Sequence, residues 1–496
     1  MSTPLTAAIV GGGFGGIGTA ITLRGRGVED LLVFERGERL GGVWQHNTYP
    51  GIACDVPSHL YSYSFARNPH WRRRYSPGDQ IRAYLEDCMR RFGVQDAVRT
   101  GVDVTDATWD EGRAVWRLTT SEGEHEARVL VTACGQLSEP SIPQIEGIER
   151  FAGPAFHSAR WRSDLDLRGL RVAVIGTGAS AIQFVPAIAP LVRELHVFQR
   201  SAPWIMPKSD RAYAPWENRL FERIPARQLA GRLANWAFFE AAVPGFVDHQ
   251  WMLRPIAAVN AALLRRQVPD PELRERLRPT DDVGCKRLLV SNDWYPAFNR
   301  PNVELVTDGV ARVTPTSVIG NDGVEREVDV IIFGTGFNAN GFVAPMRVTG
   351  RDGVQLTDAW DPLPQAYLGT AVSGFPNLFM LYGPNTNMGA GSAIYLLESQ
   401  MRHVAEAVSL LRRTHGRSLE VRPEAQAAYN RELRDRLARS VWESGCSSWY
   451  VDEHGVDTSN WPGTMTEFRR RSAHVGLDAY RLDLTPVAQR PLSPSA

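Results

Sequence analysis

Two charged residues of opposite sign lie at matching positions, each behind a glycine-rich turn. Glu35 follows Gly11 by 24 residues, at the end of an apolar run. Arg200 follows Gly176 by the same 24 residues, again at the end of an apolar run. A carboxylate at this offset suits the ribose 2′-hydroxyl of FAD or NAD, whereas a guanidinium beside a hydroxyl, here that of Ser201, suits the 2′-phosphate of NADPH. The pair predicts one site for FAD and one for NADPH, as in a flavoprotein that takes hydride from NADPH.

Each glycine-rich turn stands between an apolar strand and an apolar helix. The first, Gly-x-Gly-x-x-Gly over 11–16, follows the expected strand 7–10, and the second, Gly-x-Gly-x-x-Ala over 176–181, follows the expected strand 172–175. The leading glycines permit a tight turn and close approach of backbone N–H groups to a pyrophosphate, and the small third residue lets the helix pack on the strand. We therefore expect cofactor contacts at Gly11, Gly13, Gly16, Gly176, Thr177, Gly178, Ala179, Ser180 and Ala181.

Length and composition limit the possible classes of protein. The chain has 496 residues, 43% of them hydrophobic, which is enough for two or three domains with full cores. Its net charge is +0, so there is no electrostatic case for nucleic acid or an acidic membrane as a partner. The sequence contains no run of 18 apolar residues, so we expect no membrane-spanning helix, and the N-terminus lacks the positive region of a signal peptide. These features predict a cytoplasmic enzyme.

The five cysteines, at 54, 88, 134, 285 and 446, are far apart in the sequence and include no Cys-x-x-Cys. Their spacing indicates a protein whose cysteines are reduced. It also counts against a disulfide reductase, a class that otherwise shares the two-nucleotide plan. Neither a metal-ligand cluster nor a Ser/His/Asp set is evident in the sequence, so we expect no metal.

The order of the elements predicts an α/β fold with two Rossmann-like, three-layer ββα dinucleotide-binding domains. Apolar strands that end in small-residue turns, near 133–135 and 334–337, mark where the chain passes from one domain to the other. We therefore assign residues 1–150 and 340–496 to a discontinuous FAD-binding domain and residues 151–339 to an NADPH-binding domain. The stretch at about 203–283 has helical periodicity interrupted by prolines, so we expect a helical insertion in the NADPH domain.

Further motifs resemble those of the type I Baeyer–Villiger monooxygenases, which are class B flavoprotein monooxygenases. The run Gly-Gly-x-Trp-x-x-x-x-Tyr-Pro-Gly-x-x-x-Asp over 41–55 resembles one signature of that family. Phe-x-Gly-x-x-x-His-x-x-x-Trp over 151–161 is similar to its fingerprint, although Arg162 occupies a place that the family fills with Pro or Asp. Related flavin monooxygenases that oxygenate nitrogen or sulfur resemble this motif but lack the tryptophan, here Trp161.

The resemblance, which covers nearly the whole chain, implies the remaining site residues. It places Lys286 with Arg200 and Ser201 at the 2′-phosphate, and Arg287 beside the flavin. The role of His157 stays open: it is either a histidine bonded to backbone at the domain junction or a group that transfers protons. It also implies cofactor contacts at Phe14, Gly42, Val43, Trp44, Asp55, Tyr61, Val104 and Asn385.

The chemistry that the resemblance implies is insertion of one oxygen atom beside a ketone carbonyl, with consumption of NADPH and O2. Reduced flavin reacts with oxygen at C4a to give a peroxide, which attacks a carbonyl when anionic and oxygenates sulfur or nitrogen when protonated. The anionic route needs a fixed cation in a water-poor site, and Arg287 is the candidate, with Asp55 holding its direction.

Two other functions stay open at this point. The first is an S- or N-oxygenating flavin monooxygenase, against which Trp161 and the Lys286–Arg287 pair argue. The second is a flavoprotein without turnover, such as a redox sensor. The sequence leaves the particular ketone, the regiochemistry and the oligomeric state undetermined.

Overall fold

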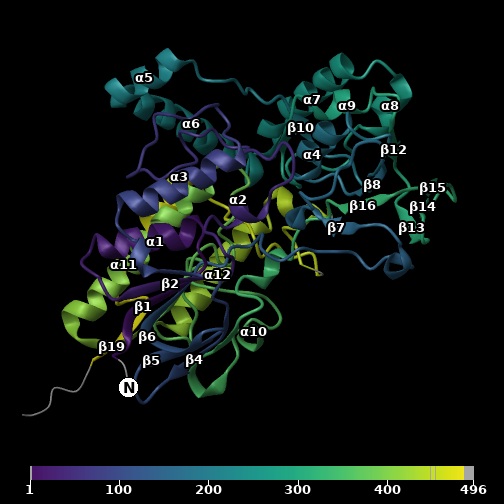
Figure 1. The fold of residues 1–496 in the computed structure, drawn as a ribbon. Helices are drawn as coiled ribbons and strands as arrows, with labels where there is room; N and C mark the ends of the chain where they lie inside the picture. The colour runs from purple at the N-terminus through teal and green to yellow at the C-terminus, as the bar shows by residue number, and fades with distance from the viewer. Residues whose placement is uncertain (1–2, 447, 453, 485–496) are drawn as a thin grey trace, which may run out of the picture.

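The first glycine-rich turn lies at the end of a central strand in an eight-stranded sheet (Figure 1). The computed structural model describes residues 3–446, 448–452 and 454–484. The strand order is β17-β4-β5-β6-β1-β2-β3, with β18 paired to β6, and all pairs are parallel except in the meander β4-β5-β6. The strands are β1 (Leu5–Val10), β2 (Leu31–Glu35), β3 (Val98–Thr100), β4 (Val104–Asp110), β5 (Val115–Thr120), β6 (Gly123–Thr132), β17 (Arg347–Thr349) and β18 (Leu378–Met380).

Alternate residues of β1 pack on opposite faces of this sheet, as the pleat of a strand requires. Ala8 lies in the core shared with the meander strands. Ala7 and Ile9 lie in the core on the other face, beneath the helices α1 (Phe14–Arg24), α3 (Gly78–Arg91) and α11 (Ala393–Thr414). This unit therefore has three layers, two of them β and one α.

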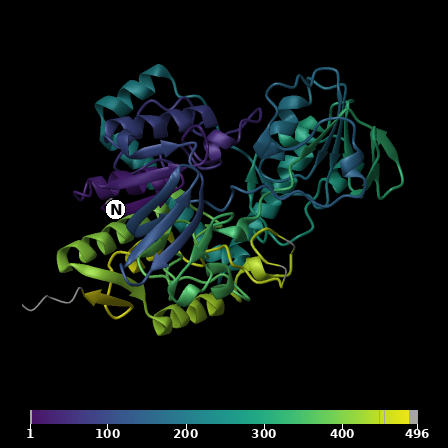
Figure 2. The same cartoon turned by 60° about the horizontal axis from the view of Figure 1, so that its bottom comes forward.

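The second glycine-rich turn belongs to a smaller, all-parallel sheet with the order β12-β9-β8-β16-β7. Val172 and Val174 pack beneath α4 (Ala181–Ile188), and Ala173 packs toward a three-stranded antiparallel sheet. The three layers are thus repeated, and Figure 2 shows the two units on opposite sides of the molecule. The strands are β7 (Ala155–His157), β8 (Arg171–Ile175), β9 (Glu194–Phe198), β12 (Val303–Val306) and β16 (Val330–Phe333), with β13 (Val310–Val313), β14 (Ser317–Gly320) and β15 (Glu325–Glu327) in the small sheet.

The two glycine-rich turns are built alike. Gly11 has φ +111°, and a Cβ there would lie 2.4 Å from the carbonyl oxygen of Ala133. Gly176 has φ +105°, and a Cβ there would lie 2.4 Å from the carbonyl oxygen of Gly334. Both positions require glycine because the backbone that directly follows the neighbouring strand, β6 in one unit and β16 in the other, passes over the turn.

The helical stretch expected at about 203–283 contacts both units (Figure 1). Its outer helices α5 and α6 lie beside α3, and the buried Arg232 of α6 donates hydrogen bonds of 2.9 Å to the carbonyl oxygens of His59 and Ser62. Leu264 of α7 packs instead in the core of the smaller sheet. Pro225 is the first residue of α6 and Pro255 is the second residue of α7, whereas Pro244 lies inside α6, two residues before its end. The helices are α5 (Pro215–Arg223), α6 (Pro225–Phe246), α7 (Arg254–Gln267) and α8 (Pro271–Arg276).

Nine further α-helices and strands belong to the described part of the chain. None of its helices combines the length and the hydropathy that crossing a bilayer requires. Within the same residues, no group of three or more His, Cys, Asp or Glu side chains is arranged to hold a metal ion. The remaining α-helices and strands are α2 (Val43–His46), β10 (Ile205–Met206), β11 (Leu289–Val290), α9 (Trp294–Ala297), α10 (Leu356–Ala359), β19 (Gly416–Val421), α12 (Pro423–Leu437), α13 (Met465–Arg471) and β20 (Tyr480–Leu484).

Candidate active site

A cavity of about 470 Å³ opens above the first glycine-rich turn. Gly16 lies beneath the turn, where a Cβ would meet the carbonyl oxygen of Gly11 at 1.8 Å. The predicted FAD contacts that the structure brings together around this cavity are up to 93 positions apart in the sequence, from Gly11 to Val104. The predicted FAD contacts that line it are Gly11, Gly13, Phe14, Glu35, Gly42, Val43, Trp44, Tyr61 and Val104.

Backbone N–H groups hold the carboxylate of Glu35 at the rim of this cavity. The carboxylate accepts hydrogen bonds from the backbone nitrogens of Gly12, at 2.7 Å, and Gly37, at 2.8 Å. Glu35 is 5% exposed and is one of the residues that line the cavity. A fixed acceptor at the end of β2 is what a ribose hydroxyl needs.

Gln136 is a residue of this cavity that the sequence interpretation missed. It lines the cavity wall and is 2% exposed, yet neither its amide nitrogen nor its amide oxygen has a hydrogen-bond partner among the residues that the structure describes. Buried amides are almost always paired, so this side chain fits a cavity that receives a polar ligand such as a flavin. The signal was available, because Gln136 directly follows the small-residue turn that ends β6.

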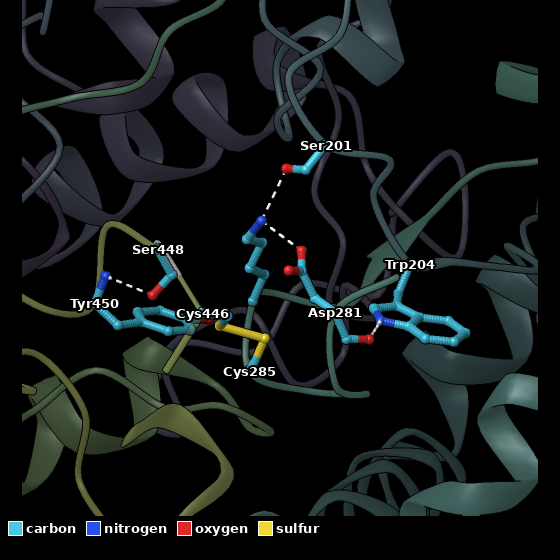
Figure 3. The surroundings of a disulfide bond; sticks show 8 residues. Ser201, Trp204, Asp281, Cys285, Cys446, Ser448 and Tyr450 are labelled. Carbon is cyan, nitrogen blue, oxygen red and sulfur yellow. Dashed lines mark hydrogen bonds and ion pairs between the residues drawn. A yellow bond between two sulfur atoms is a disulfide. The ribbon is translucent and has the colours of Figure 1, made fainter. Parts of the chain in front are cut away.

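The predicted NADPH residues gather at the ends of β8 and β9 in the smaller unit. Gly176 to Ala181 form the turn from β8 into α4. The ammonium of Lys286 donates to the hydroxyl of Ser201 at 2.8 Å and forms an ion pair with Asp281 (Figure 3). Arg200 directly precedes Ser201, so two cationic side chains and a hydroxyl belong to one edge. This donor set fits the 2′-phosphate of NADPH.

Arg287 and Asp55 form an ion pair between the two units. The guanidinium donates to one carboxylate oxygen of Asp55 through Nε at 3.0 Å and through Nη2 at 2.6 Å. Arg287 is positioned by β11, which begins at Leu289 and pairs in parallel with β10. The side chain of Arg287 keeps 31% of its surface exposed, so a bound ligand can still reach the guanidinium.

Both members of this pair are charged over the working pH range. Burial opposes ionisation of Asp55, but the charge and hydrogen bonds of Arg287 outweigh burial and lower the carboxyl pKa below its ordinary value. The charge of Asp55 in turn raises the pKa of Arg287. Burial also raises the pKa of the adjacent Tyr450 to about 12, so this phenol stays neutral. The site therefore holds one fixed positive charge beside one fixed negative charge.

This electrostatic arrangement predicts a flat pH profile for the pair. The folded pKa of Asp55 lies below its ordinary 3.8, so the stabilisation from pairing is fully present above the unfolded value and is lost only as the pH falls through the folded value. We expect kcat/KM for substrate to show no ionisation of this pair between about pH 5 and pH 10. An acidic limb above pH 5 that disappears in Asp55→Asn would contradict the assignment.

Gln183 of α4 holds the loop that carries Asp55, and the sequence interpretation gave it no role. Its amide oxygen accepts from the backbone nitrogen of Ala53 at 3.1 Å, and its amide nitrogen donates to the Ala53 carbonyl at 3.0 Å. A Cβ on Gly51, at φ +82°, would lie 2.7 Å from the Gln183 carbonyl oxygen. The loop is thus in close contact with the α4 backbone four residues before Asp55 and bonds to the Gln183 side chain two residues before it.

Gln183→Leu is expected to loosen this contact and increase the share of NADPH oxidised without product several-fold. Each lost hydrogen bond costs about 0.5–1.5 kcal/mol, and the Ala53 N–H would be left unpaired. The measurement is product formed per NADPH consumed. Gln80→Leu is the matched control, because Gln80 makes the same pair of backbone hydrogen bonds to the 70–72 loop. Equal effects of the two substitutions would contradict a specific role for Gln183.

His157 lies buried at the junction of the units. Its Nδ1 accepts from the backbone nitrogen of Ala159 at 3.1 Å, and burial lowers its pKa, so the imidazole is neutral. Trp161 packs against Phe184 of α4, with ring centroids 5.4 Å apart. These contacts agree with a histidine bonded to backbone at the domain junction.

The segment 441–463 packs against the site through buried aromatic side chains. Trp442 stacks on Phe246 of α6, with centroids 5.9 Å apart, and Tyr450 interacts electrostatically with Arg287. Asn385, a predicted cofactor contact, lies outside the lining of the FAD cavity. Its amide donates at 3.1 Å to the carbonyl oxygens of Asp457 and Asn460, so its side chain braces this segment.

The expectation that all cysteines are reduced is wrong. Cys285 and Cys446 form a disulfide with Cα atoms 6.3 Å apart (Figure 3). The sequence did not reveal the pair because the two cysteines are 161 residues apart and meet only when the stretch around Cys446 packs on the stretch that precedes β11. The free cysteines are Cys54, Cys88 and Cys134.

Together these features define the class of protein. One cavity with a fixed carboxylate fits FAD, a second edge with Lys286, Arg200 and Ser201 fits NADPH, and the Asp55–Arg287 pair lies between the units. This is a two-nucleotide flavoprotein that takes reducing equivalents from NADPH.

The chain belongs to the Baeyer–Villiger monooxygenase family. It is 44% identical over 486 residues to a Baeyer–Villiger monooxygenase of Pseudomonas aeruginosa, which covers 97% of this chain and 92% of that one. It is 43% identical over 477 residues to one of Streptomyces coelicolor, with 96% and 92% covered. The family model for pyridine nucleotide-disulphide oxidoreductases matches residues 8–233.

Solved structures agree with this membership. A cyclohexanone monooxygenase from Rhodococcus sp. Phi1 bound to NADP+ has a TM-score of 0.87 at 27% identity, with 98% of this chain and 100% of that chain covered. A steroid monooxygenase bound to NADP has a TM-score of 0.87 at 30% identity, with the same coverage. The chain is therefore an FAD-containing, NADPH-dependent monooxygenase of the Baeyer–Villiger type, and the predicted α/β fold class and cofactors are confirmed.

Proposed function

We propose that this enzyme converts a ketone into an ester or a lactone. One atom of O2 enters beside the carbonyl carbon, and the other leaves as water with the hydride of NADPH and a proton. FAD, when bound, supplies the activation of oxygen, and NADPH supplies the hydride. The protein must bind both nucleotides, exclude water and stabilise the negative charge that develops on the carbonyl oxygen.

The observation that carries this proposal is the Asp55–Arg287 ion pair. An arginine stays charged at any working pH and presents several N–H donors, so it can stabilise an oxyanion without gaining or losing a proton. Asp55 engages Nε and Nη2 of the guanidinium, and the Arg287 side chain keeps 31% of its surface exposed. In this assignment Arg287 acts on the reacting atoms and Asp55 is its positioning residue.

The cavity over β1 and the edge at the ends of β8 and β9 support the two cofactor assignments. We assign the FAD to the cavity over β1 and the 2′-phosphate of NADPH to Arg200, Ser201 and Lys286. Residues 1–150 and 340–496 then form the FAD domain, and residues 151–339 form the NADPH domain. The insertion contacts both through Arg232 and Leu264. The cytoplasmic location expected from the sequence stays a prediction.

The test is a screen of linear, cyclic and aromatic ketones with purified holoenzyme and NADPH, in which mass spectrometry detects products that are heavier by one oxygen atom. Thioethers and tertiary amines are included as competing substrate classes. Ester or lactone formation that depends on NADPH would support the proposal. Oxygenation of amines alone, with every ketone returned unchanged, would overturn it.

A further inference from the structure

The disulfide joins two chain segments that are 161 residues apart in the sequence (Figure 3). Cys285 directly precedes Lys286 and Arg287. Cys446 belongs to the segment that carries Tyr450, whose phenol interacts electrostatically with Arg287. The bond therefore links the stretch that carries Lys286 and Arg287 to the segment whose Tyr450 interacts with Arg287.

The first of these segments is itself tied to the nucleotide edge. Lys286 donates to the hydroxyl of Ser201 at 2.8 Å and pairs with Asp281. The carbonyl oxygen of Asp281 accepts a hydrogen bond of 3.0 Å from the indole of Trp204 (Figure 3). A constraint placed at Cys285 is thus one residue from Lys286, the group assigned to the 2′-phosphate.

The accessibility of the two sulfur atoms differs. Cys285 is completely buried, whereas Cys446 is partly exposed. The three free cysteines are poor competitors, because burial raises the pKa of Cys88 to about 11, that of Cys134 to about 12 and that of Cys54 further still. A thiol in this state is a weak nucleophile. Of the two paired cysteines, an oxidant from solution therefore meets Cys446 first.

We propose that Cys285 and Cys446 are a reversible redox modification site whose disulfide fixes the stretch with Cys446 and Tyr450 beside the stretch with Lys286 and Arg287. Hydrogen peroxide is the oxidant. The Cys446 thiolate attacks one oxygen of the peroxide, the O–O bond breaks, and the products are a sulfenic acid and hydroxide. The Cys285 thiolate then attacks the sulfenic sulfur and expels a second hydroxide. The two hydroxides take up the two protons that the thiols released, so two thiols and one peroxide give one disulfide and two waters. A dithiol reverses the step by exchange.

The consequence for the enzyme is a change in nucleotide affinity. A covalent link holds Lys286 near the geometry that binding requires, so less ordering is needed when the nucleotide arrives. The reduced holoenzyme is expected to bind NADP+ roughly 3- to 10-fold more weakly than the oxidised holoenzyme. This expectation rests on the assignment of Lys286 to the 2′-phosphate, whereas the pairing of the cysteines does not.

The experiment compares holoenzyme reduced with a phosphine with the same protein reoxidised by one equivalent of hydrogen peroxide. Alkylation and mass spectrometry should find five free thiols in the reduced form, and three plus a Cys285–Cys446 cross-linked peptide in the oxidised form. The NADP+ dissociation constant is measured in both forms from the flavin absorbance, without any ketone. The oxidised form should bind more tightly.

Two variants make the outcome specific. Cys446→Ser should bind NADP+ as the reduced protein does and should not respond to peroxide. Cys88→Ser, the matched control with a buried free cysteine, should respond as the native protein does. Failure of the cross-link to form, equal NADP+ affinity in the two forms, or a response of Cys446→Ser to peroxide would each overturn the proposal. None of these readouts depends on ketone oxygenation, so failure of the proposed function would be seen separately.

Discussion

Arg287→Ala is expected to abolish ester formation while flavin reduction by NADPH continues. Removing a preorganised donor from an oxyanion costs about 3 kcal/mol or more, which corresponds to at least a roughly 100-fold loss in the rate of oxygen insertion. NADPH consumption should persist and end as hydrogen peroxide. The measurement follows flavin reduction in a stopped-flow instrument and ester formation by chromatography in the same preparation.

Controls separate this chemical effect from a loss of structure. Removal of Arg287 leaves Asp55 without its partner, so Arg287→Ala combined with Asp55→Asn relieves the uncompensated charge. Arg287→Lys keeps the charge but not the two-point contact through Nε and Nη2, so it should restore only part of the activity. Ester formation at the native rate in Arg287→Ala with full flavin content would contradict the role assigned to Arg287.

The second large effect concerns the choice between NADPH and NADH. Arg200→Ala is expected to lower kcat/KM for NADPH by roughly 10- to 100-fold, because a hydrogen bond to a charged phosphate contributes about 1.5–3 kcal/mol. The value for NADH, which lacks the 2′-phosphate, should change little. Steady-state kinetics with both nucleotides measures this ratio.

Arg193 provides the matched control for this substitution. It precedes β9 at the end opposite to Arg200, and it pairs with Glu194 at 3.6 Å on the surface. Arg193→Ala should leave both kinetic constants near their native values. A parallel loss for NADPH and NADH in Arg200→Ala would place Arg200 away from the 2′-phosphate.

Short-range signals were enough to predict the two nucleotide folds. The glycine turns, their flanking apolar strands and the offset to Glu35 or Arg200 all lie within about 30 residues, where backbone geometry leaves few alternatives. The structure places Gly11 and Gly176 at the positive φ that these turns need. The alternation of Ala7, Ala8 and Ile9 between two cores follows the same local rule.

Helix α6 shows why packing around the insertion could not be predicted. A surface helix normally turns its apolar side inward. Here the buried residues include Gln228 and Arg232, which bond to the FAD-side loop, while Leu233 and Phe238 are 52% and 71% exposed. Periodicity alone assigns the opposite faces.

The missed site residues depend on contacts between distant parts of the chain. Gln183 meets Ala53 across 130 residues, and Cys285 meets Cys446 across 161. Gln136 directly follows the small-residue turn that ends β6, but its amide is buried without a partner among the described residues, and this property exists only in the folded chain. The family resemblance predicted that Asp55 holds the direction of Arg287, and the structure adds the geometry of the ion pair between them.

The central claim is that a fixed cation directs activated oxygen to a carbonyl carbon. The most direct measurement is a single turnover with an active ketone. Native holoenzyme is reduced anaerobically with one equivalent of NADPH and mixed with ¹⁸O2, and the labelled ester is counted per flavin. We predict close to one labelled ester per flavin for the native protein and almost none for Arg287→Ala. Native protein that returns only hydrogen peroxide and unchanged ketone, or Arg287→Ala that matches the native yield, would contradict the account.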